Sequence, residues 1–362
     1  MNYAVIMAGG TGKRLWPLSR QKRPKQMLKL LDGQTLLGQC FERLCPVFDT
    51  RSIIVLTNVG YADLVREHLP ELPFNNVIAE PTVRDTAGAI GLAATILSKY
   101  DPDATMAIVT ADQLLEPPET FQDALRDAFE FIANEPEALI TFGVKPSFPS
   151  TQLGYIKCAD PRECAKCKNT VYSVEAFREK PDLATAQAYL KEGGYFWNSG
   201  MFVWKAKTIL SFIEKFLPEA TEPLREIGAA WDTPMQEKVL REYFVKLPKI
   251  SIDYAVMEKA DKVHAIQLDG RWLDMGSFAA LADVISSDEN GNIVVAGISE
   301  LLGCRNSIIA TEDKEHLIAA IGLENIVVAH TPDATLVCHL DQTERLKELL
   351  ERIEQDGRSN FL

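Results

Sequence analysis

Residues 3–26 have the sequence YAVIMAGGTGKRLWPLSRQKRPKQ, and this stretch is the best guide to the fold. Its first five residues are apolar, and a Gly-rich turn follows them directly. A buried strand that runs into such a turn is typical of parallel α/β sheets, in which ligands bind beyond the carboxyl ends of the strands. The turn exposes backbone N–H groups, which form a natural cradle for phosphate.

The Gly-rich turn matches neither of two common nucleotide-binding motifs. A P-loop requires glycine five residues before the pair Gly12-Lys13, and Met7 occupies that position. The dinucleotide fingerprint requires glycine where Leu15 stands. A structural turn between strand and helix is the alternative to a phosphate cradle, and the residues that follow favour the cradle.

A group of basic residues follows the turn. The chain as a whole is acidic, with 38 Lys and Arg, 51 Asp and Glu and a formal net charge of -13. This balance argues against a nucleic-acid-binding surface. A local basic loop beside a Gly-rich turn suits a triphosphate, although solvated charge runs are also common. The loop contains Lys13, Arg14, Arg20, Lys22, Arg23 and Lys25.

Short apolar runs alternate with helical patterns up to about residue 145. We predict strands at residues 3–7, 53–56, 76–79, 106–109 and 139–142. We predict helices between them at residues 36–44, 63–69, 86–98 and 121–132. This alternation indicates βαβ units and a parallel sheet covered on both faces.

The rest of the chain has a different pattern. A strand pair at 154–158 and 172–177 precedes helices near 184–190, 208–216 and 234–245. Short apolar segments at 293–296, 307–310, 326–329 and 335–338 suggest a small β domain or the coils of a β-helix. Residues 341–355 have the apolar spacing of an amphipathic helix.

Two loops that end predicted strands carry further candidates. Glu80 begins a loop in which Asp85 or Thr86 is predicted to cap the next helix. Asp112 follows the apolar run 106–109, where a carboxylate is well placed to bind Mg²⁺, a cation that prefers oxygen ligands. A lone aspartate in this position is as often a cap, so the prediction depends on its neighbours.

The chain shows no pattern of secretion or membrane insertion. No basic residue precedes the short apolar run at residues 3–7, and no apolar stretch approaches the roughly 20 residues that span a bilayer. Seven cysteines do not fit a secreted disulfide framework, so a cytoplasmic protein is expected. Cys164 and Cys167 form a C-x-x-C pair, for which a surface loop is favoured over a metal site.

Taken together, these residues resemble the sugar-phosphate nucleotidyltransferase family, and within it the mannose-1-phosphate guanylyltransferases. RLWPLSR at 14–20 and PKQ at 24–26 resemble the pyrophosphorylase signature of that family. WNSGMF at 197–202 and SIDYAVMEK at 251–259 resemble the mannose enzymes. The resemblance implies an α/β fold with a doubly wound, mixed or mostly parallel sheet at residues 1–285. It also implies a short left-handed β-helix and a terminal helix at residues 286–362.

The resemblance further implies that GTP and mannose 1-phosphate react to give GDP-mannose and pyrophosphate, with Mg²⁺ as the cofactor. The implied catalytic residues are Arg14, Lys25 and Asp112, and the implied metal ligands are Asp112 and Asp274. The implied nucleotide-binding residues are Ala8, Gly9, Gly10, Thr11, Gly12, Lys13, Arg14, Glu80, Asp85 and Thr86. The implied sugar-phosphate-binding residues are Gly143, Gly154, Glu179, Lys180 and Asn198.

Some positions depart from the family pattern and affect the expected details of base and sugar contact. Asp85 and Gly88 stand where Asn and Pro are usual, and Gln113 and Phe278 stand where His and Trp are usual. TQLG at 151–154 replaces the usual TGYGY. The isomerase domain that is fused to some relatives is expected to be absent, so the chain should not make its own mannose 6-phosphate.

Three rival functions are weighed against this one. A sister enzyme would use glucose 1-phosphate with UTP or dTTP, or would run the reaction in reverse. A silent regulatory subunit should lack Lys25, Asp112 or Asp274, and all three are present. A NAD-dependent dehydrogenase is disfavoured by the failed fingerprint at Leu15. The sequence does not fix the oligomeric state, and a homodimer is the assembly that we consider.

Overall fold

The computed structural model describes residues 1–362 except 11, 30–32, 296 and 312. The chain divides into two compact units. The first, called the sheet unit, consists of Met1–Gly9, Phe41–Thr110 and Leu115–Trp272. The second, called the β-helix unit, consists of Gly10–Cys40, Ala111–Leu114 and Leu273–Leu362. Each unit therefore combines segments that are far apart in the sequence. The predicted division into residues 1–285 and 286–362 stays a prediction.

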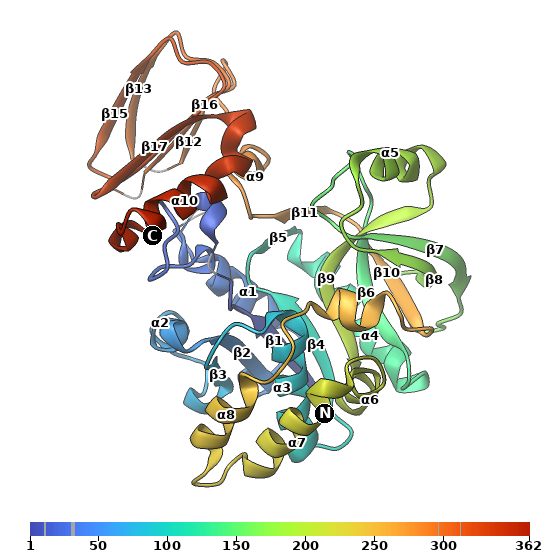
Figure 1. The fold of residues 1–362 in the computed structure, drawn as a ribbon. Helices are drawn as coiled ribbons and strands as arrows, with labels where there is room; N and C mark the ends of the chain where they lie inside the picture. Colours follow the sequence, from blue (N-terminus) through green and yellow to red (C-terminus); the bar gives the residue numbers. More distant parts are fainter. Residues whose placement is uncertain (11, 30–32, 296, 312) are drawn as a thin grey trace. The chain divides into compact units, whose positions relative to one another are not determined.

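The sheet unit is built on a nine-stranded sheet with the order β3-β2-β1-β4-β9-β6-β10-β8-β7 (Figure 1). Its strands are β1 (Asn2–Met7), β2 (Ile53–Asn58), β3 (Val77–Glu80), β4 (Thr105–Thr110), β6 (Leu139–Val144), β7 (Tyr155–Arg162), β8 (Val171–Arg178), β9 (Tyr195–Lys205) and β10 (Val263–Leu268). The first four strands in the order pair in parallel, as do β6 and β10. The pairings of β9 with β4, β6 and β7 are antiparallel, so the sheet is mixed.

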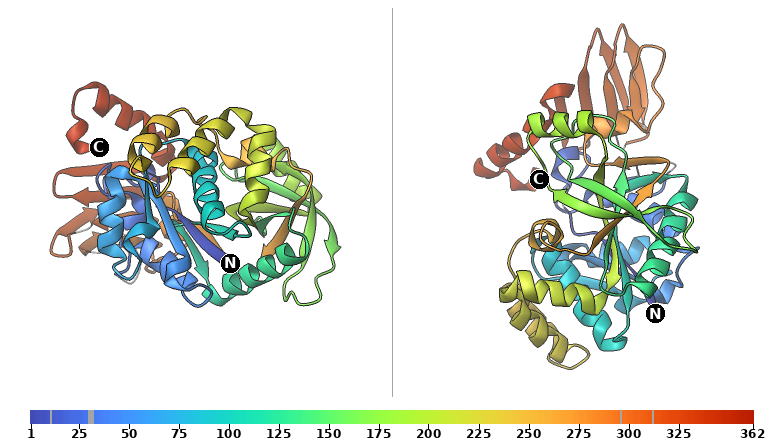
Figure 2. Two further views of the ribbon diagram at one scale, coloured as in Figure 1. Left: turned by 90° about the horizontal axis from the view of Figure 1, so that it is seen from below. Right: turned by 90° about the vertical axis from the view of Figure 1, so that its right-hand side faces the viewer.

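Helices cover both faces of this sheet (Figures 1 and 2). They are α2 (Ala62–His68), α3 (Asp85–Tyr100), α4 (Pro118–Asn134), α5 (Leu183–Glu192), α6 (Ala206–Phe216), α7 (Thr221–Ala230) and α8 (Gln236–Phe244). Helix α3 is rich in small buried residues, and a Cβ added at Gly91 would lie 2.8 Å from Leu224 of α7. These small residues allow α3 to pack closely against its neighbours.

The β-helix unit contains stacked short strands and the Gly-rich segment. Strands β12 (Ile293–Val295), β14 (Ile308–Thr311) and β16 (Ile326–Thr331) form one parallel ladder, which β17 (Ala334–His339) joins in the antiparallel sense. Strands β13 (Ile298–Leu302) and β15 (Leu317–Ile321) form a second parallel ladder. Consecutive coils that pair strand on strand in two ladders confirm the predicted β-helix-like domain.

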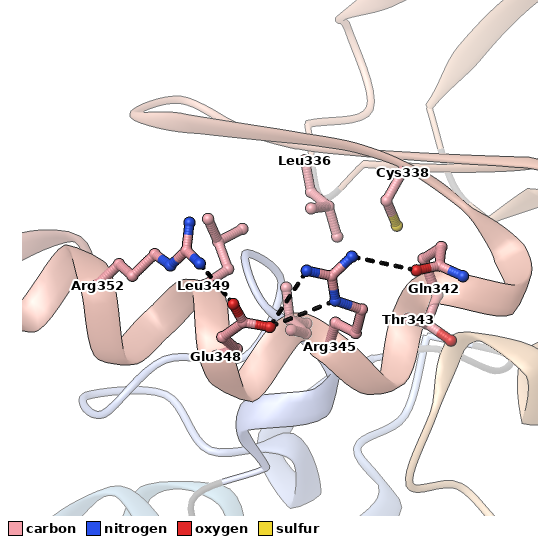
Figure 3. A pocket seen from close by; sticks show the side chains of 9 residues that line it. Leu336, Cys338, Gln342, Thr343, Arg345, Glu348, Leu349 and Arg352 are labelled. Atoms are coloured by element: carbon pink, nitrogen blue, oxygen red, sulfur yellow. Dashed lines mark hydrogen bonds and ion pairs between the residues drawn. The ribbon is translucent and has the colours of Figure 1, made fainter.

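Helices and the Gly-rich segment complete this unit. Helices α9 (Phe278–Ala282) and α10 (Leu346–Gln355) contribute Phe278, Leu346 and Leu350 to one apolar core with Leu15 and strands β12, β14, β16 and β17. A groove of about 220 Å³ lies between β17 and α10 (Figure 3). The charged side chains that line this groove form ion pairs with one another, since Arg345 and Arg352 both bind Glu348.

Three elements span points where the chain passes from one unit to the other. Helix α1 (Leu36–Leu44) matches its predicted bounds, and the short strands β5 (Gln113–Glu116) and β11 (Arg271–Asp274) pair in a two-stranded sheet. Among the residues that the structure describes, no helix is both long and apolar enough to span a membrane.

Most elements predicted before residue 145 are present, with shifted ends. The strand predicted at 76–79 is β3, displaced by one residue because Asn76 belongs to a 3₁₀ turn. The cap predicted at Asp85 or Thr86 is wrong. The residue before α3 is Arg84, and the Asp85 carboxylate accepts the N–H of Thr86 rather than capping the helix.

Candidate active site

The Gly-rich segment leaves β1 and has a glycine-dependent shape at Gly12. This residue has φ of 64°, and a Cβ added to it would lie 2.5 Å from the Lys25 Cβ. Only glycine tolerates both the left-handed backbone and this close approach. The Gly12 carbonyl also accepts hydrogen bonds from the Leu15 N–H, at 3.1 Å, and from the Ser19 hydroxyl, at 2.5 Å. The turn is therefore folded back against the segment that carries Lys25.

The neighbouring predicted residues are placed as follows. In the sheet unit, Ala8 continues the β1–β2 pairing, because its N–H donates to the Leu56 carbonyl and its carbonyl accepts from the Thr57 hydroxyl. A Cβ at Gly9 or Gly10 would meet open space. Thr11 lies outside the described residues. Lys13 and Arg14 belong to the 3₁₀ turn η1 (Lys13–Leu15), and both are exposed.

Lys25 forms the centre of a charged cluster in the β-helix unit. Its ammonium group binds a carboxylate oxygen of Asp112 and lies 3.7 Å from an oxygen of Asp274. A hydrogen bond from the Met275 N–H to the Asp112 carbonyl, 3.1 Å long, holds the two aspartate-bearing segments together. Three residues that are far apart in the sequence are thus brought to one point.

The electrostatics of this cluster follow from burial and from its opposite charges. Burial alone would lower the Lys25 pKa, but the charges of Asp112 and Asp274 outweigh it and raise this pKa. Burial raises the pKa of Asp274, and the nearby Lys25 and Arg14 oppose that effect. Arg14 therefore lies close enough for its charge to act on the cluster.

Two side chains of the cluster, Asp112 and Asp274, could hold a divalent metal ion. Two carboxylates converge on one positive charge, so the geometry already suits a cation. Mg²⁺ commonly binds one or two carboxylates and completes its shell with water and substrate phosphates. The described residues contain no group of three or more His, Cys, Asp or Glu side chains that could hold a metal ion by themselves. Asp112 and Asp274 thus fit a metal that is shared with a phosphate substrate.

A second cluster lies in the sheet unit, around Asn198 of β9. The Asn198 N–H donates to the Gly154 carbonyl at 2.8 Å, and β9 pairs Asn198 with Gly143 of β6. A Cβ at Gly154 would collide with the Glu179 carboxylate, and one at Gly143 would lie 2.8 Å from the Phe196 Cβ. The sequence-predicted residues Gly143, Gly154, Glu179 and Asn198 are therefore packed together.

Lys180 completes this group of predicted residues. Its ammonium lies 3.0 Å from a Glu179 carboxylate oxygen. Its backbone has φ of 44°, which is uncommon for a residue other than glycine. Such backbone strain is often found at functional sites.

Two acidic residues that were not among the predicted site residues support this cluster. Asp253 accepts a 3.0 Å hydrogen bond from the Asn198 amide, and Glu258 accepts one of 2.9 Å from the Glu179 N–H. Asp253 begins η7 (Asp253–Met257), a single π-helical turn of a type often found at functional sites. Burial, followed by the charge of Glu179, raises the Asp253 pKa to about 7. Their block, residues 251–259, was noticed in the sequence, but its pattern did not reveal these contacts.

The residues predicted near the base and ribose also belong to the sheet unit. Glu80 ends β3, is buried, and has its pKa raised to about 8 by desolvation. Asp85 has φ of 61°, a second strained backbone position. The Thr86 hydroxyl accepts a 2.8 Å hydrogen bond from the Ile252 N–H. Thr86 is thus tied to the residue that precedes Asp253.

One member of the basic loop has a different role from the one predicted. The Arg20 guanidinium is bound to Asp333, Thr331 and the Phe361 carbonyl within the β-helix unit. These contacts occupy its donors, so Arg20 is not available to a triphosphate as the loop pattern suggested.

The C-x-x-C pair forms an internal bond. Cys164 and Cys167 are joined by a disulfide in the β7–β8 connection. The backbone N–H groups of Lys168 and Asn169 then bind the carboxylate of Asp127 on α4. The pair therefore belongs to a loop fastened to α4, and the sulfurs are bonded to each other rather than arranged around a metal.

Comparisons with known proteins place this geometry in a family. Residues 3–291 match the family described as nucleotidyl transferase, and residues 284–353 match the MannoseP isomerase/GMP-like beta-helix domain. A mannose-1-phosphate guanylyltransferase of Klebsiella pneumoniae is 39% identical over 99% of this chain and 75% of that protein. One of Escherichia coli is 38% identical over the same shares of the two proteins.

A solved structure agrees with these relatives. The crystal structure described as a mannose-1-phosphate geranyltransferase from Thermus thermophilus is 33% identical and has a TM-score of 0.85. The match covers 98% of this chain and 99% of that one. The chain therefore belongs to the nucleotidyl transferase family and, within it, to the mannose-1-phosphate guanylyltransferases.

Proposed function

We propose that this chain transfers GMP from GTP to mannose 1-phosphate, giving GDP-mannose and pyrophosphate. The observation that carries the proposal is the convergence of Asp112 and Asp274 on Lys25, which packs against Gly12 of the Gly-rich turn. Nucleotidyl transfer depends on positioning and charge neutralisation rather than on a protein nucleophile. The names of the relatives support guanine and mannose as the substrate groups.

The reaction is an in-line displacement at the α-phosphorus of GTP. A phosphate oxygen of mannose 1-phosphate forms the new P–O bond, the bond to the bridging oxygen of the β-phosphate breaks, and pyrophosphate leaves. The attacking phosphate is already anionic at pH 7, so no general base is required. The reverse reaction, in which pyrophosphate attacks GDP-mannose, uses the same groups.

The Gly-rich turn and the basic side chains would bind the triphosphate. The backbone N–H groups of Gly9, Gly10, Gly12, Lys13 and Arg14 would donate to phosphate oxygens. Lys25 would neutralise charge beside the reacting phosphorus, and Arg14 would add a second positive charge. Glu80, Asp85 and Thr86 would lie near the base and ribose.

Asp112 and Asp274 would hold Mg²⁺ together with oxygens of the bound phosphates. Bound there, the metal would neutralise the charge that develops on the α-phosphate and on pyrophosphate. Lys25 then has a defined role, because its ammonium group holds both carboxylates close together before substrates arrive.

Gly143, Gly154, Glu179, Lys180 and Asn198 would bind the mannose phosphate. Glu179 and Asn198 offer acceptors and donors suited to sugar hydroxyls, and Lys180 offers a cation suited to phosphate. The glycines allow these side chains to approach the backbone closely. Asp253 and Glu258 would hold Asn198 and Glu179 in position.

Pyrophosphate release is the test, measured with Mg²⁺ for mannose 1-phosphate and glucose 1-phosphate against each of GTP, ATP, UTP and dTTP. We expect release with GTP and mannose 1-phosphate alone. Release with another pair would indicate a sister specificity, and no release from folded protein would favour a regulatory subunit. A cytoplasmic location and a homodimeric assembly stay predictions from the sequence.

A further inference from the structure

The described part of the Gly-rich segment has little regular structure to hold its shape. Between Gly10 and Gln34 it contains two 3₁₀ turns, η1 and η2 (Lys25–Met27), and one isolated β-bridge between Arg20 and Arg23. A segment without a strand ladder or a long helix depends on side-chain anchors for its conformation. The identity of these anchors therefore bears on where Lys25 lies.

Arg20 is the most extensively bonded anchor. Its Nη2 donates to Asp333 at 2.6 Å and to the Thr331 hydroxyl at 2.9 Å, and its Nη1 donates to the other Asp333 oxygen at 3.2 Å. This two-point contact with one carboxylate is the strong, directional form of the Arg–Asp pair. Asp333 stands in the turn between β16 and β17.

Two further contacts reinforce the same attachment. The Phe361 carbonyl accepts hydrogen bonds from Arg20 and from the Trp16 ring N–H, both 2.7 Å long. The Arg20 guanidinium lies over the Trp16 ring at 5.7 Å, and its Nε donates to the Pro17 carbonyl. The Arg20 side chain is only 14% exposed, whereas Asp333 is 52% exposed. An exposed pair alone would contribute little, but this one is part of a network.

The backbone connects this network to Lys25. Arg20 and Arg23 exchange two backbone hydrogen bonds, of 2.8 Å and 3.0 Å, which close a tight loop. Pro24 has its own φ fixed by the ring and leads directly into Lys25. On the other side, the Ser19 hydroxyl binds the Gly12 carbonyl, and Gly12 packs against Lys25. A displacement of Arg20 would therefore move both Lys25 and the Gly-rich turn.

We propose that Arg20 and Asp333 are positioning residues for nucleotidyl transfer, through which the β16–β17 turn holds the Gly-rich segment in its working conformation. Neither residue touches the reacting atoms in this proposal. It rests on the proposed role of Gly12 and Lys25 in binding the triphosphate. Burial would raise the Asp333 pKa, yet hydrogen bonds from Arg20 and Thr331 lower it, which is consistent with a stable ion pair.

The experiment compares Asp333→Asn with the unmodified protein in steady-state assays with GTP, mannose 1-phosphate and Mg²⁺. We expect KM for GTP to rise at least fivefold and kcat to fall about tenfold, while KM for mannose 1-phosphate changes less than twofold. Simple destabilisation would reduce the active fraction and lower kcat alone, so the selective rise in KM for GTP identifies positioning. Asp333→Glu, which retains the carboxylate, should recover part of the loss.

Asp341→Asn is the matched control, because Asp341 is 80% exposed in the same unit and its ion pair with His339 lies at the surface. Hydrogen exchange of residues 12–28 gives a second readout, and we expect faster exchange in Asp333→Asn. If that variant does not fold, Thr331→Val removes one acceptor of Arg20 with little change of shape, and the same kinetic and exchange changes are expected.

Folded Asp333→Asn with unchanged KM for GTP and unchanged exchange would overturn the proposal. The two hypotheses can fail separately. Absence of turnover in the unmodified protein with every substrate pair would remove the proposed function, and the exchange of residues 12–28 would still decide whether Arg20 and Asp333 hold the segment.

Discussion

The Lys25 cluster of the β-helix unit and the Asn198 cluster of the sheet unit place their acidic groups in opposite surroundings. Asp112 and Asp274 face a lysine ammonium, and their ion pairs hold Lys25 in a segment whose described residues have little regular structure. Asp253 is partly buried behind Asn198, next to strands that are closely paired. The Lys25 cluster therefore offers charged groups, and the Asn198 cluster offers hydrogen-bonding groups held in fixed positions.

This difference separates two tasks of a nucleotidyltransferase. Stabilising a transferring phosphoryl group requires charges near the reacting phosphorus, and these can sit on a loop if anchors hold it. Selecting one sugar requires hydrogen-bond donors and acceptors in fixed positions. In our proposal, close packing of side chains against glycines of the paired strands holds them there. We therefore expect substitutions in the first cluster to lower kcat most and those in the second to change recognition of the sugar phosphate.

Replacement of Lys25 by alanine is expected to have the largest effect. Loss of its ammonium leaves Asp112 and Asp274 facing each other without a cation and removes a charge beside the proposed α-phosphate. We expect kcat to fall by about 10²–10³, as for removal of one electrostatic contact to a developing charge. Steady-state pyrophosphate release measures the change, and Lys347→Ala, an exposed lysine of α10, is the control. Near-normal rates in folded Lys25→Ala would contradict the assignment of this cluster to catalysis.

Gly154→Ala should produce the next largest kinetic effect, and this substitution changes the Asn198 cluster. The new Cβ would displace the Glu179 carboxylate, which is the flexible end of a side chain, so the backbone need not move. We expect KM for mannose 1-phosphate to rise about tenfold, with KM for GTP nearly unchanged, because one sugar contact is lost. Gly60→Ala, at an exposed turn, serves as the control. A rise in KM for GTP instead would show that the two clusters do not divide recognition in this way.

The sequence predicted the elements with strong apolar periods and the residues with a family signature. Helix α1 was predicted at its observed bounds, and β1, β2, β4 and β6 were found within two residues. Strand β9 was not predicted, because Asn198, Ser199 and Gly200 interrupt its apolar run. The exposed β-helix strand β13 was missed as well, because Ser299 and Glu300 interrupt its apolar residues and Ile298 and Leu302 are exposed.

Tertiary contacts explain why parts of the candidate site could not be predicted. The role of Arg20 depends on Asp333, a residue more than three hundred positions away that no local pattern connects to it. Asp253 is functional in our proposal because it accepts a hydrogen bond from the Asn198 amide, and this contact is not visible in the sequence block that contains Asp253. The spacing of strands along the chain indicates which loops share a sheet edge. It does not indicate which distant side chain accepts a hydrogen bond from a given donor, such as the Arg20 guanidinium.

Asp253→Asn probes whether the acidic group behind Asn198 acts through its charge. Burial and the neighbouring Glu179 raise the Asp253 pKa to about 7, while Lys180 opposes this. Above that pH an additional negative charge develops beside Glu179 and disfavours an anionic sugar phosphate. We expect KM for mannose 1-phosphate to rise a few-fold between pH 6 and pH 8.5 in the unmodified protein, and less in Asp253→Asn, which keeps an acceptor for the Asn198 amide. Equal pH profiles of the two proteins would rule out this role of the charge.

Glu80→Gln extends the comparison from kinetics to stability. Burial raises the Glu80 pKa from 4.5 to about 8, so the folded chain keeps a proton that the unfolded chain has lost. The free energy of unfolding contributed by this group therefore falls as pH rises from 4.5 to 8, by up to about 1.4 kcal/mol per pH unit, and is constant above pH 8. Denaturant unfolding across this range should show a shallower decline in Glu80→Gln, whereas Glu67→Gln, at an exposed position of α2, should retain the original slope. An unchanged slope in Glu80→Gln would mean that burial does not raise the Glu80 pKa in the folded chain, and the contrast between the acidic groups of the two units would not extend to β3.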